Sequence, residues 1–272
     1  MDPLTRGSLF HSVQFRLLTR LREEHRLPMG DENLAAATRM ADEVLNEIAM
    51  EYREELVPAI SRIWESEVED LRTDLRGWLR QRAQLAADGE QWQPRYFEFS
   101  FGLVRSGDRD PESSSEEALI LDGIRLRGSI DLVEEHSSRE TLRIVEHKTG
   151  RAPAQPPVAL GGGEVLQPML YALAAEDLLG KPVGTSELSY CTQRGDYRRV
   201  EVSVNEASRK NTETAMRLID QSLKEGFLPA APRERACMSC DYRIVCGPYE
   251  QLRTARKDRG RLGLIEQLRQ MP

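Results

Sequence analysis

Apolar residues recur at helical spacing through the first third of the chain. One such segment ends at a break over residues 26–30, a second runs from Asp31 to about Leu56, and a third runs from Pro58 to about Gly89. Asp31 suits an N-cap, and Pro58 suits a first helical turn, where a missing N–H is tolerated. The pattern predicts a helical lobe over residues 1–93.

The hydrophobic period changes to two at residues 95–101, where three phenylalanines alternate with polar residues. We expect a strand there, with the phenylalanines on one face and Glu98 on the other. Residues 106–117 are polar and acidic, which indicates a surface loop. Further strands are expected at residues 119–121 and 124–133 around an Asp122-Gly123 turn, and at 187–193 and 197–204 around Gly195-Asp196.

A polar turn near Ser138 separates two apolar runs, one carrying Asp131 and the other carrying Glu146, His147 and Lys148. Successive strand residues face opposite sides, so Glu146 and Lys148 share a face and His147 points away. Counting outward from the turn places Asp131 opposite Glu146 in an antiparallel hairpin. Two carboxylates and a lysine would then converge. That arrangement fits either a buried metal site or a surface hairpin with an ordinary salt bridge.

Two more helices are expected in the second half of the chain. Pro168 belongs in a first helical turn, which places Gln167 at a helix N-terminus and Tyr171 one turn later on the same side. Asn205 is a suitable cap for a long helix that ends near Gly226. A cysteine-bearing segment and a basic amphipathic tail follow.

Composition and charge limit the class of protein. The 272 residues are 39% hydrophobic and 31% charged, which is typical of a charge-rich globular chain. A net charge of -7 argues against indiscriminate nucleic-acid binding, although arginine-rich runs at 194–199, 233–235 and 253–261 fit either a positive groove or solvated faces. No run of about 18 apolar residues and no signal peptide is found, so we expect a cytoplasmic protein without a membrane partner.

Three of the four cysteines cluster as Cys237-x2-Cys240-x5-Cys246. In a chain expected to be cytosolic, such clustering favours metal or iron-sulfur ligation over disulfides. The fourth, Cys191, lies within an expected strand, which is more typical of a buried structural thiol.

Taken in order, these motifs resemble the RecB-type nuclease domain of the PD-(D/E)xK superfamily, and within it the C-terminal nuclease domain of AddB-like helicase-nuclease subunits. Each motif alone is weak, and their shared order carries the resemblance. The matching pieces are Gly7-x3-His11, Phe97-Glu98-Phe99, Gly128-Ser129-Ile130-Asp131, Val145-Glu146-His147-Lys148-Thr149-Gly150, Gln167-x3-Tyr171, the three clustered cysteines, and the chain end Leu268-Arg269-Gln270-Met271-Pro272.

The resemblance implies an α/β fold of the restriction-endonuclease-like type, with a central mixed β-sheet flanked by helices. It places an N-terminal helical lobe before this core and a cysteine-bearing segment after it. We therefore expect a single nuclease domain over residues 1–272, divided into a lobe (1–93), a nuclease core (94–230) and a cysteine motif with its tail (231–272).

The resemblance also implies Mg²⁺- or Mn²⁺-dependent hydrolysis of DNA, as an exonuclease of a helicase-nuclease acting in double-strand-break repair and recombination. It assigns the metal to Asp131, Glu146 and the backbone carbonyl of His147, and the orientation and deprotonation of the attacking water to Lys148. The remaining roles are carried over as His11 for a further metal ligand, Glu98 for an accessory ligand, and Gln167 and Tyr171 for contacts to the metal shell or the DNA backbone.

One feature departs from the resemblance. Related iron-sulfur proteins carry their first cluster cysteine upstream of the Gly-x3-His motif, and no cysteine precedes Gly7 here. Three thiolates do not complete a four-ligand site for a 4Fe-4S cluster or for zinc. Either the chain is a fragment without its first ligand, or Cys191 substitutes, or the cluster is absent.

Two other functions compete with catalysis. The chain could be a catalytically silent module that binds DNA or a helicase partner through its arginine-rich segments, and its DNA binding would then be salt-sensitive and would survive loss of Asp131. It could also be an iron-sulfur scaffold with broad visible absorbance. The intact set of Asp131, Glu146, Lys148, Gln167 and Tyr171 favours a nuclease.

Overall fold

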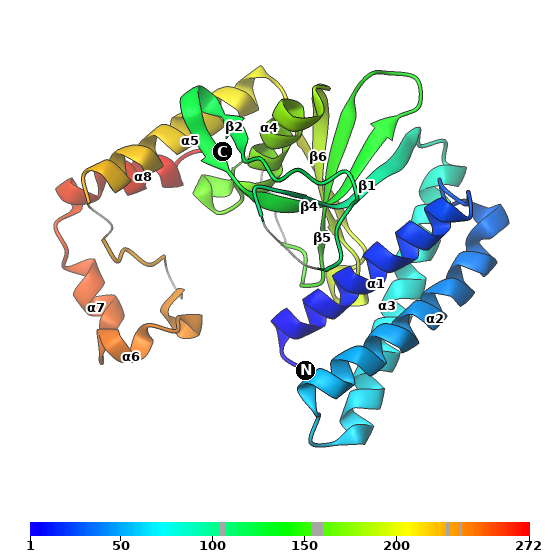
Figure 1. Cartoon of the computed structure of the whole chain (residues 1–272). Helices are drawn as coiled ribbons and strands as arrows, with labels where there is room; N and C mark the ends of the chain where they lie inside the picture. The colour runs from blue at the N-terminus through cyan, green and yellow to red at the C-terminus, as the bar shows by residue number, and fades with distance from the viewer. Residues whose placement is uncertain (104–106, 154–159, 227–228, 234–235) are drawn as a thin grey trace. The chain divides into compact units, whose positions relative to one another are not determined.

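The computed structural model describes residues 1–103, 107–153, 160–226, 229–233 and 236–272 (Figure 1). The chain divides into two compact units. Unit 1 comprises Met1–Pro157 and Gln167–Asn205, and unit 2 comprises Val158–Leu166 and Glu206–Pro272. The three-part division expected from the sequence stays a prediction.

The three helices predicted in the first third of the chain are confirmed as α1 (Pro3–Glu23), α2 (Asp31–Leu56) and α3 (Ser61–Ala87). One predicted N-cap, Asp31, and one predicted helix start, Pro58, are wrong. Gly30 is the N-cap of α2, because its N–H donates to the Asn33 side chain at 3.0 Å and Asp31 already lies inside the helix. The third helix begins at Ser61 instead of Pro58, because Val57 ends α2 in a left-handed conformation and the next residues span the turn.

Unit 1 also contains a five-stranded mixed sheet in the order β1-β4-β5-β6-β7 (Figure 1). β5 and β6 pair in parallel, and the connection between them contains helix α4 (Gln167–Leu179), as a parallel crossover requires. The other neighbouring pairs are antiparallel. The strands are β1 (Trp92–Phe101), β4 (Gly128–His136), β5 (Leu142–Lys148), β6 (Val183–Tyr190) and β7 (Arg199–Ser203).

The predicted β4–β5 hairpin is confirmed, with Leu132 opposite Val145 and Glu134 opposite Arg143. Extending this register by one residue brings Asp131 opposite Glu146, as counted from the sequence. The run expected as one strand over residues 124–133 divides at Arg127 into β3 (Ile124–Leu126) and β4. β3 pairs with β2 (Ala118–Ile120) across the turn η1 (Leu121–Gly123), as expected for that hairpin.

The three phenylalanines of β1 do not share a face as predicted. Phe97 packs in the core of the helical lobe with Leu132, whereas Phe101 packs edge-to-face against Tyr171 of α4. The strand alternation breaks at Glu98, whose φ of 49° lies in the left-handed region. A residue in that conformation interrupts the pleat that would keep alternate side chains on one side.

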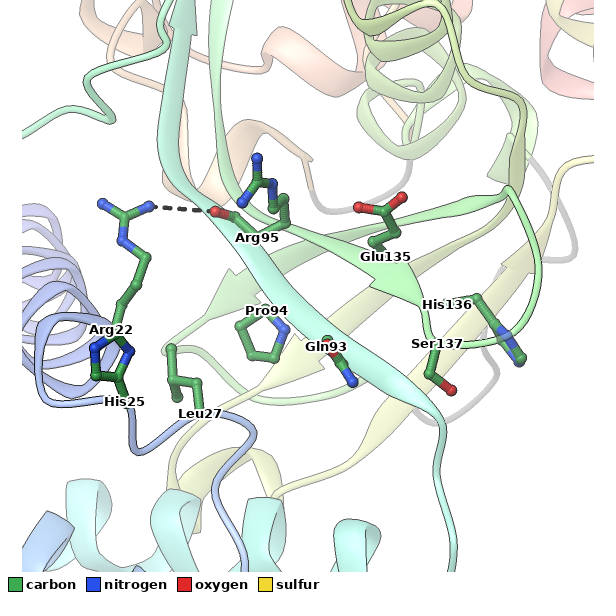
Figure 2. A pocket seen from close by; sticks show the side chains of 9 residues that line it. All are labelled: Arg22, His25, Leu27, Gln93, Pro94, Arg95, Glu135, His136 and Ser137. Atoms are coloured by element: carbon green, nitrogen blue, oxygen red, sulfur yellow. Dashed lines mark hydrogen bonds between the residues drawn. The ribbon is translucent and has the colours of Figure 1, made fainter.

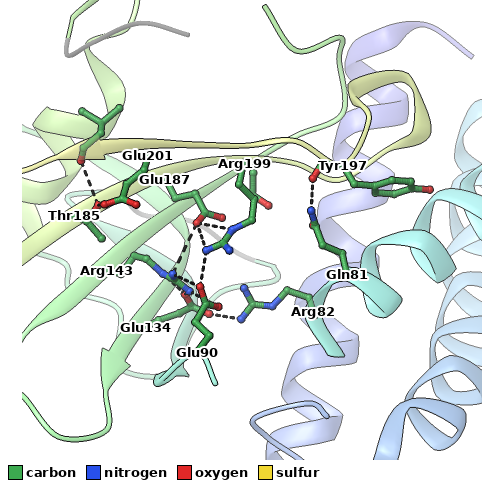
Figure 3. A network of polar contacts seen from close by, with 12 residues as sticks. Gln81, Arg82, Glu90, Glu134, Arg143, Thr185, Glu187, Tyr197, Arg199 and Glu201 are labelled. Carbon is green, nitrogen blue, oxygen red and sulfur yellow. Dashed lines mark hydrogen bonds and ion pairs between the residues drawn. The ribbon is translucent and has the colours of Figure 1, made fainter. Parts of the chain in front are cut away.

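A network of buried and half-buried ion pairs crosses four neighbouring strands (Figure 3). Arg143 on β5 donates to Glu134 on β4 at 2.6 Å and to Glu90 at 2.8 Å. Arg199 on β7 donates to Glu187 on β6 at 2.8 Å and to Glu90 at 2.7 Å. Burial of these charges is tolerated because each one is paired.

Unit 2 is built around the predicted long helix, which begins directly after Asn205. Within it, the Leu160 N–H donates to the Pro272 carbonyl at 2.7 Å, and α8 packs against α5. Of the basic run 233–235, residues 234 and 235 lie outside the described residues. The elements of unit 2 are η2 (Gly161–Gly163), α5 (Glu206–Lys224), η4 (Ala236–Ser239), α6 (Arg243–Cys246), α7 (Glu250–Ala255), η5 (Arg259–Leu262) and α8 (Gly263–Arg269).

Among the helices that the structure describes, none combines the length and apolar character needed to cross a membrane.

Candidate active site

An open cleft of about 930 Å³ lies in unit 1, lined by residues of α1, β1, β4, β5 and α4. The cleft holds all of the side chains that the sequence singled out on these elements. Those side chains are His11, Glu98, Asp131, Glu146, Lys148, Gln167 and Tyr171.

His11, Glu98 and Asp131 converge from three different elements. His11 Nδ1 lies 3.3 Å from Glu98 Oε1 and 3.2 Å from Asp131 Oδ1. One ligand atom of each residue lies within 4.8 Å of the others. Burial alone would lower the pKa of His11, but Asp131 and Glu98 outweigh it and raise this pKa to about 10.

Asp131 is held at the start of the hairpin. Its Oδ2 accepts a hydrogen bond of 2.7 Å from the His147 N–H. Burial raises the pKa of Asp131, but His11 and this backbone N–H outweigh burial and lower it below the ordinary value. The His147 side chain points away, as predicted, and its ring packs edge-on to Trp78 with centroids 5.7 Å apart. Burial there lowers the pKa of His147 to about 3.

Glu146 and Lys148 share a face of β5, as predicted. Lys148 Nζ lies 3.5 Å from Glu146 Oε2 and donates to Gln167 Oε1 at 2.9 Å. Glu146 is buried, and its Oε1 has no hydrogen-bond partner in the described part of the chain. Burial and the neighbouring Asp131 raise the pKa of Glu146 well above its ordinary range.

These donors fit a hard divalent cation. Carboxylate oxygens face one cleft with His11, whose nitrogen becomes a ligand once the ion displaces its proton. The buried Oε1 of Glu146 lacks a partner, which such an ion would supply. A cation beside Asp131 and Glu146 would also favour the ionised form of both carboxylates. Glu146 lies outside the close group of His11, Glu98 and Asp131, and its carboxylate pairs with Lys148.

Gln167 and Tyr171 approach the site from the first two turns of α4. Gln167 is the first residue of α4, as predicted, with Pro168 in the first turn. Burial raises the pKa of Tyr171, and polar contacts with Gln167 and with the Ser129 backbone partly offset this rise. A Cβ at Gly128 would lie 2.7 Å from the Tyr171 hydroxyl oxygen, so only glycine leaves room for this ring.

Ser129 is a residue of the site that the sequence reasoning did not assign. Its hydroxyl donates to Glu98 Oε2 at 3.0 Å and so holds the carboxylate from the side opposite His11. Strand alternation could have found it, because Ser129 lies two residues before Asp131 on the same strand.

Cys191 lies in unit 1, and the other three cysteines lie in unit 2. Cys191 is fully buried in the core of unit 1, its thiol donates to the Ser189 carbonyl at 3.2 Å, and burial raises its pKa to about 12. This favours the structural interpretation of Cys191. Cys237, Cys240 and Cys246 are free thiols of unit 2, and within the described residues they form no close group of three metal ligands. A cluster or zinc site there stays a prediction.

Comparison with known proteins tests the expected family. No curated protein matches the chain. A family model described as the PD-(D/E)XK nuclease superfamily matches residues 1–247. This match agrees with the mixed sheet flanked by helices and with the cleft at the start of β4 and the end of β5. The predicted restriction-endonuclease-like fold is therefore confirmed, and the chain belongs to the PD-(D/E)XK nuclease superfamily.

Proposed function

We propose that the chain is a divalent-metal-dependent deoxyribonuclease that hydrolyses phosphodiester bonds. The observation that carries this proposal is the convergence of Asp131, Glu146 and Lys148 in one cleft with His11. A surface hairpin with an ordinary salt bridge would not bury Glu146 with an unpartnered oxygen beside a second carboxylate.

Asp131 and Glu146 would hold the cation with the backbone carbonyl of His147, and His11 and Glu98 would complete the ligand set. When bound, Mg²⁺ or Mn²⁺ offsets the charge that builds on a phosphate and makes a nearby water more acidic. Ser129 keeps Glu98 aimed into the cleft by donating to its Oε2.

Lys148 orients and helps to deprotonate the attacking water. Its ammonium group has three donors, and the contacts to Gln167 and Glu146 fix the direction of the side chain. A further donor can then face a water or a phosphate oxygen in the cleft. Gln167 accepts from Lys148, so its amide N–H groups are available to Tyr171 and to a DNA phosphate.

The test is cleavage of linear single- and double-stranded DNA with Mg²⁺ or Mn²⁺. Lys148→Ala should lower the rate by about 100-fold or more, which is typical for loss of a group that handles the proton. The matched control is Lys181→Ala, because Lys181 pairs with Glu135 outside the cleft. Equal cleavage by the Lys148→Ala variant would reject the proposal.

We further propose that the activity is exonucleolytic and serves a helicase-nuclease in double-strand-break repair and recombination, in the cytoplasm. The order of motifs shared with AddB-like nuclease domains supports this, including the cysteines that would help to bind a 4Fe-4S cluster. Covalently closed circular DNA should resist cleavage if the enzyme needs an end. If both linear and circular DNA stay intact while salt-sensitive binding survives Asp131→Asn, the chain is the silent binding module instead.

A further inference from the structure

Glu98 is a non-glycine residue in the left-handed region in the middle of a strand. Phe97 and Phe99 on either side of it both pair with β4, so the irregularity is confined to Glu98. Such a conformation is unfavourable and persists where the surroundings hold it in place. The conformation is coupled to the site, because the Glu98 side chain contacts His11 and Ser129 in the cleft.

Asp110 is the residue that holds this stretch of backbone. Its Oδ2 accepts from the Phe97 N–H at 3.0 Å, and its own N–H donates to the Glu98 carbonyl at 3.2 Å. β1 is an edge strand, so these groups face away from β4 and need a partner from elsewhere. Asp110 is 1% exposed, although the sequence predicts a surface loop for this acidic segment.

Arg22 and the backbone of the same loop hold the Asp110 carboxylate in place. Arg22 Nη1 lies 3.2 Å from Asp110 Oδ2. It also donates to the Arg95 carbonyl at 3.3 Å (Figure 2). The Arg22 guanidinium lies over the Phe97 ring, 4.7 Å from its centroid. Asp110 Oδ1 accepts from the Glu112 N–H at 2.9 Å, which closes the turn.

We propose that Asp110 is a positioning residue that sets the backbone of Glu98 and thereby the affinity of the cleft for its divalent cation. The inference rests on the proposed function, since it takes Glu98 as an accessory ligand. Asp110 does not line the cleft, so it acts through the strand. Two hydrogen bonds on either side of the Glu98 Cα determine the direction of its side chain.

The test is a titration of the full chain with Mn²⁺, in which the electron paramagnetic resonance signal of free Mn²⁺ measures binding. Asp110→Asn replaces one carboxylate oxygen with an NH₂ group, which cannot accept a hydrogen bond. In one orientation the NH₂ group faces the Glu112 N–H, and in the other it faces the Phe97 N–H and Arg22. Mn²⁺ binding should weaken by about tenfold, as is typical when the support of a ligand is removed. Glu112→Gln, an exposed carboxylate of the same loop, should stay within about twofold of the wild type.

A double-mutant cycle separates positioning from general loss of structure. In a Glu98→Ala background, Asp110→Asn should change Mn²⁺ affinity by less than about twofold, because the side chain that it positions is gone. A further tenfold loss in that background, or unchanged affinity of Asp110→Asn alone, overturns the proposal. If Asp110→Asn does not fold, Arg22→Lys replaces it in the same cycle, with the same outcomes.

DNA cleavage by the same proteins distinguishes the two proposals. A wild type that binds Mn²⁺ with the expected cycle but does not cleave DNA refutes the nuclease function and supports the role of Asp110. If the wild type cleaves DNA and Asp110→Asn binds Mn²⁺ with unchanged affinity, the nuclease function is supported and the role of Asp110 is refuted. A wild type that binds no Mn²⁺ overturns the role of Asp110.

Discussion

Gly128 occupies a backbone position where a methyl group would collide with the candidate site. A Cβ there would lie 2.7 Å from the Tyr171 hydroxyl oxygen and 3.0 Å from its ring. Gly128→Ala should therefore displace Tyr171 from the cleft. Misplacement of a catalytic group by about 1 Å can cost about 100-fold in rate, so we expect a loss of that order in kcat on linear DNA.

The control for this substitution is Gly263→Ala, since no atom lies within 4 Å of a Cβ at Gly263. Both changes add one methyl group, and the control adds it in open space. The Gly128→Ala protein should keep its far-UV circular dichroism spectrum. If Gly128→Ala retains the kcat of the wild type, either the Tyr171 hydroxyl does not matter for cleavage or the strand shifts to make room for the added methyl group.

We expect a cation bound at Asp131 to stabilise the folded protein. A ligand that binds the folded state at 100 times its Kd stabilises it by about 2.7 kcal/mol. Mn²⁺ should therefore raise the Tm of the wild type, and EDTA should reverse the rise. Asp131→Asn removes one anionic ligand from the close group with His11 and Glu98, so its Tm should respond much less.

Differential scanning calorimetry with and without Mn²⁺ measures both shifts. Asp108→Asn is a useful comparison, because Asp108 also lines the cleft but lies outside the close group of ligands. Its Tm should rise with Mn²⁺ as in the wild type. An equal rise in Asp131→Asn would mean that the ion binds elsewhere.

At the scale of elements, helix α3 packs against the β6–β7 connection through Gly77. A Cβ at Gly77 would lie 2.0 Å from the Tyr197 hydroxyl oxygen, inside the ring's own volume. Glycine to alanine in an open helix would stabilise by about 1 kcal/mol. Here the added methyl group collides with Tyr197, and such overpacking costs about 1 to 3 kcal/mol. We expect this cost to outweigh the gain in helix propensity, so Gly77→Ala should lower the free energy of unfolding.

Urea unfolding of Gly77→Ala measures this change. Adding Tyr197→Ala should recover part of the loss, because it removes the ring that collides, although it leaves a cavity. Tyr197→Phe should not recover it, since ring carbons also lie within 3 Å of the added Cβ. A Gly77→Ala protein as stable as the wild type would contradict this packing.

The elements that the sequence predicted correctly depend on local signals. The β4–β5 register follows from a polar turn between two short runs, and the start of α4 follows from Pro168. Glu98 is different, because the proposed support of its left-handed backbone comes from Asp110, a residue of the segment after β1 that folds back against the outer edge of the strand. His11 reaches Asp131 through the packing of the lobe on the sheet, which hydrophobic periodicity does not describe.

At the scale of the whole molecule, the buried network around Glu90 connects the segment after α3 to the sheet (Figure 3). Burial alone would raise the pKa of Glu90, but Arg143 and Arg199 outweigh it and lower the pKa from 4.5 to about 2. A carboxyl whose pKa is lowered in the folded state stabilises that state above its unfolded pKa. This contribution is present above pH 4.5 and is lost as the pH falls towards 2.

Glu90→Gln should therefore be less stable than the wild type at pH 7, by at most about 3 kcal/mol. The difference between the two should shrink as the pH falls from 4.5 towards 2, because the wild type then loses the same charge. Urea unfolding at several pH values measures the difference directly, and other carboxyl groups cancel between the two proteins. Glu116→Gln, an exposed carboxylate, should match the wild type throughout. A gap between wild type and Glu90→Gln that stays constant with pH would mean that packing of the side chain, and not its charge, stabilises the network.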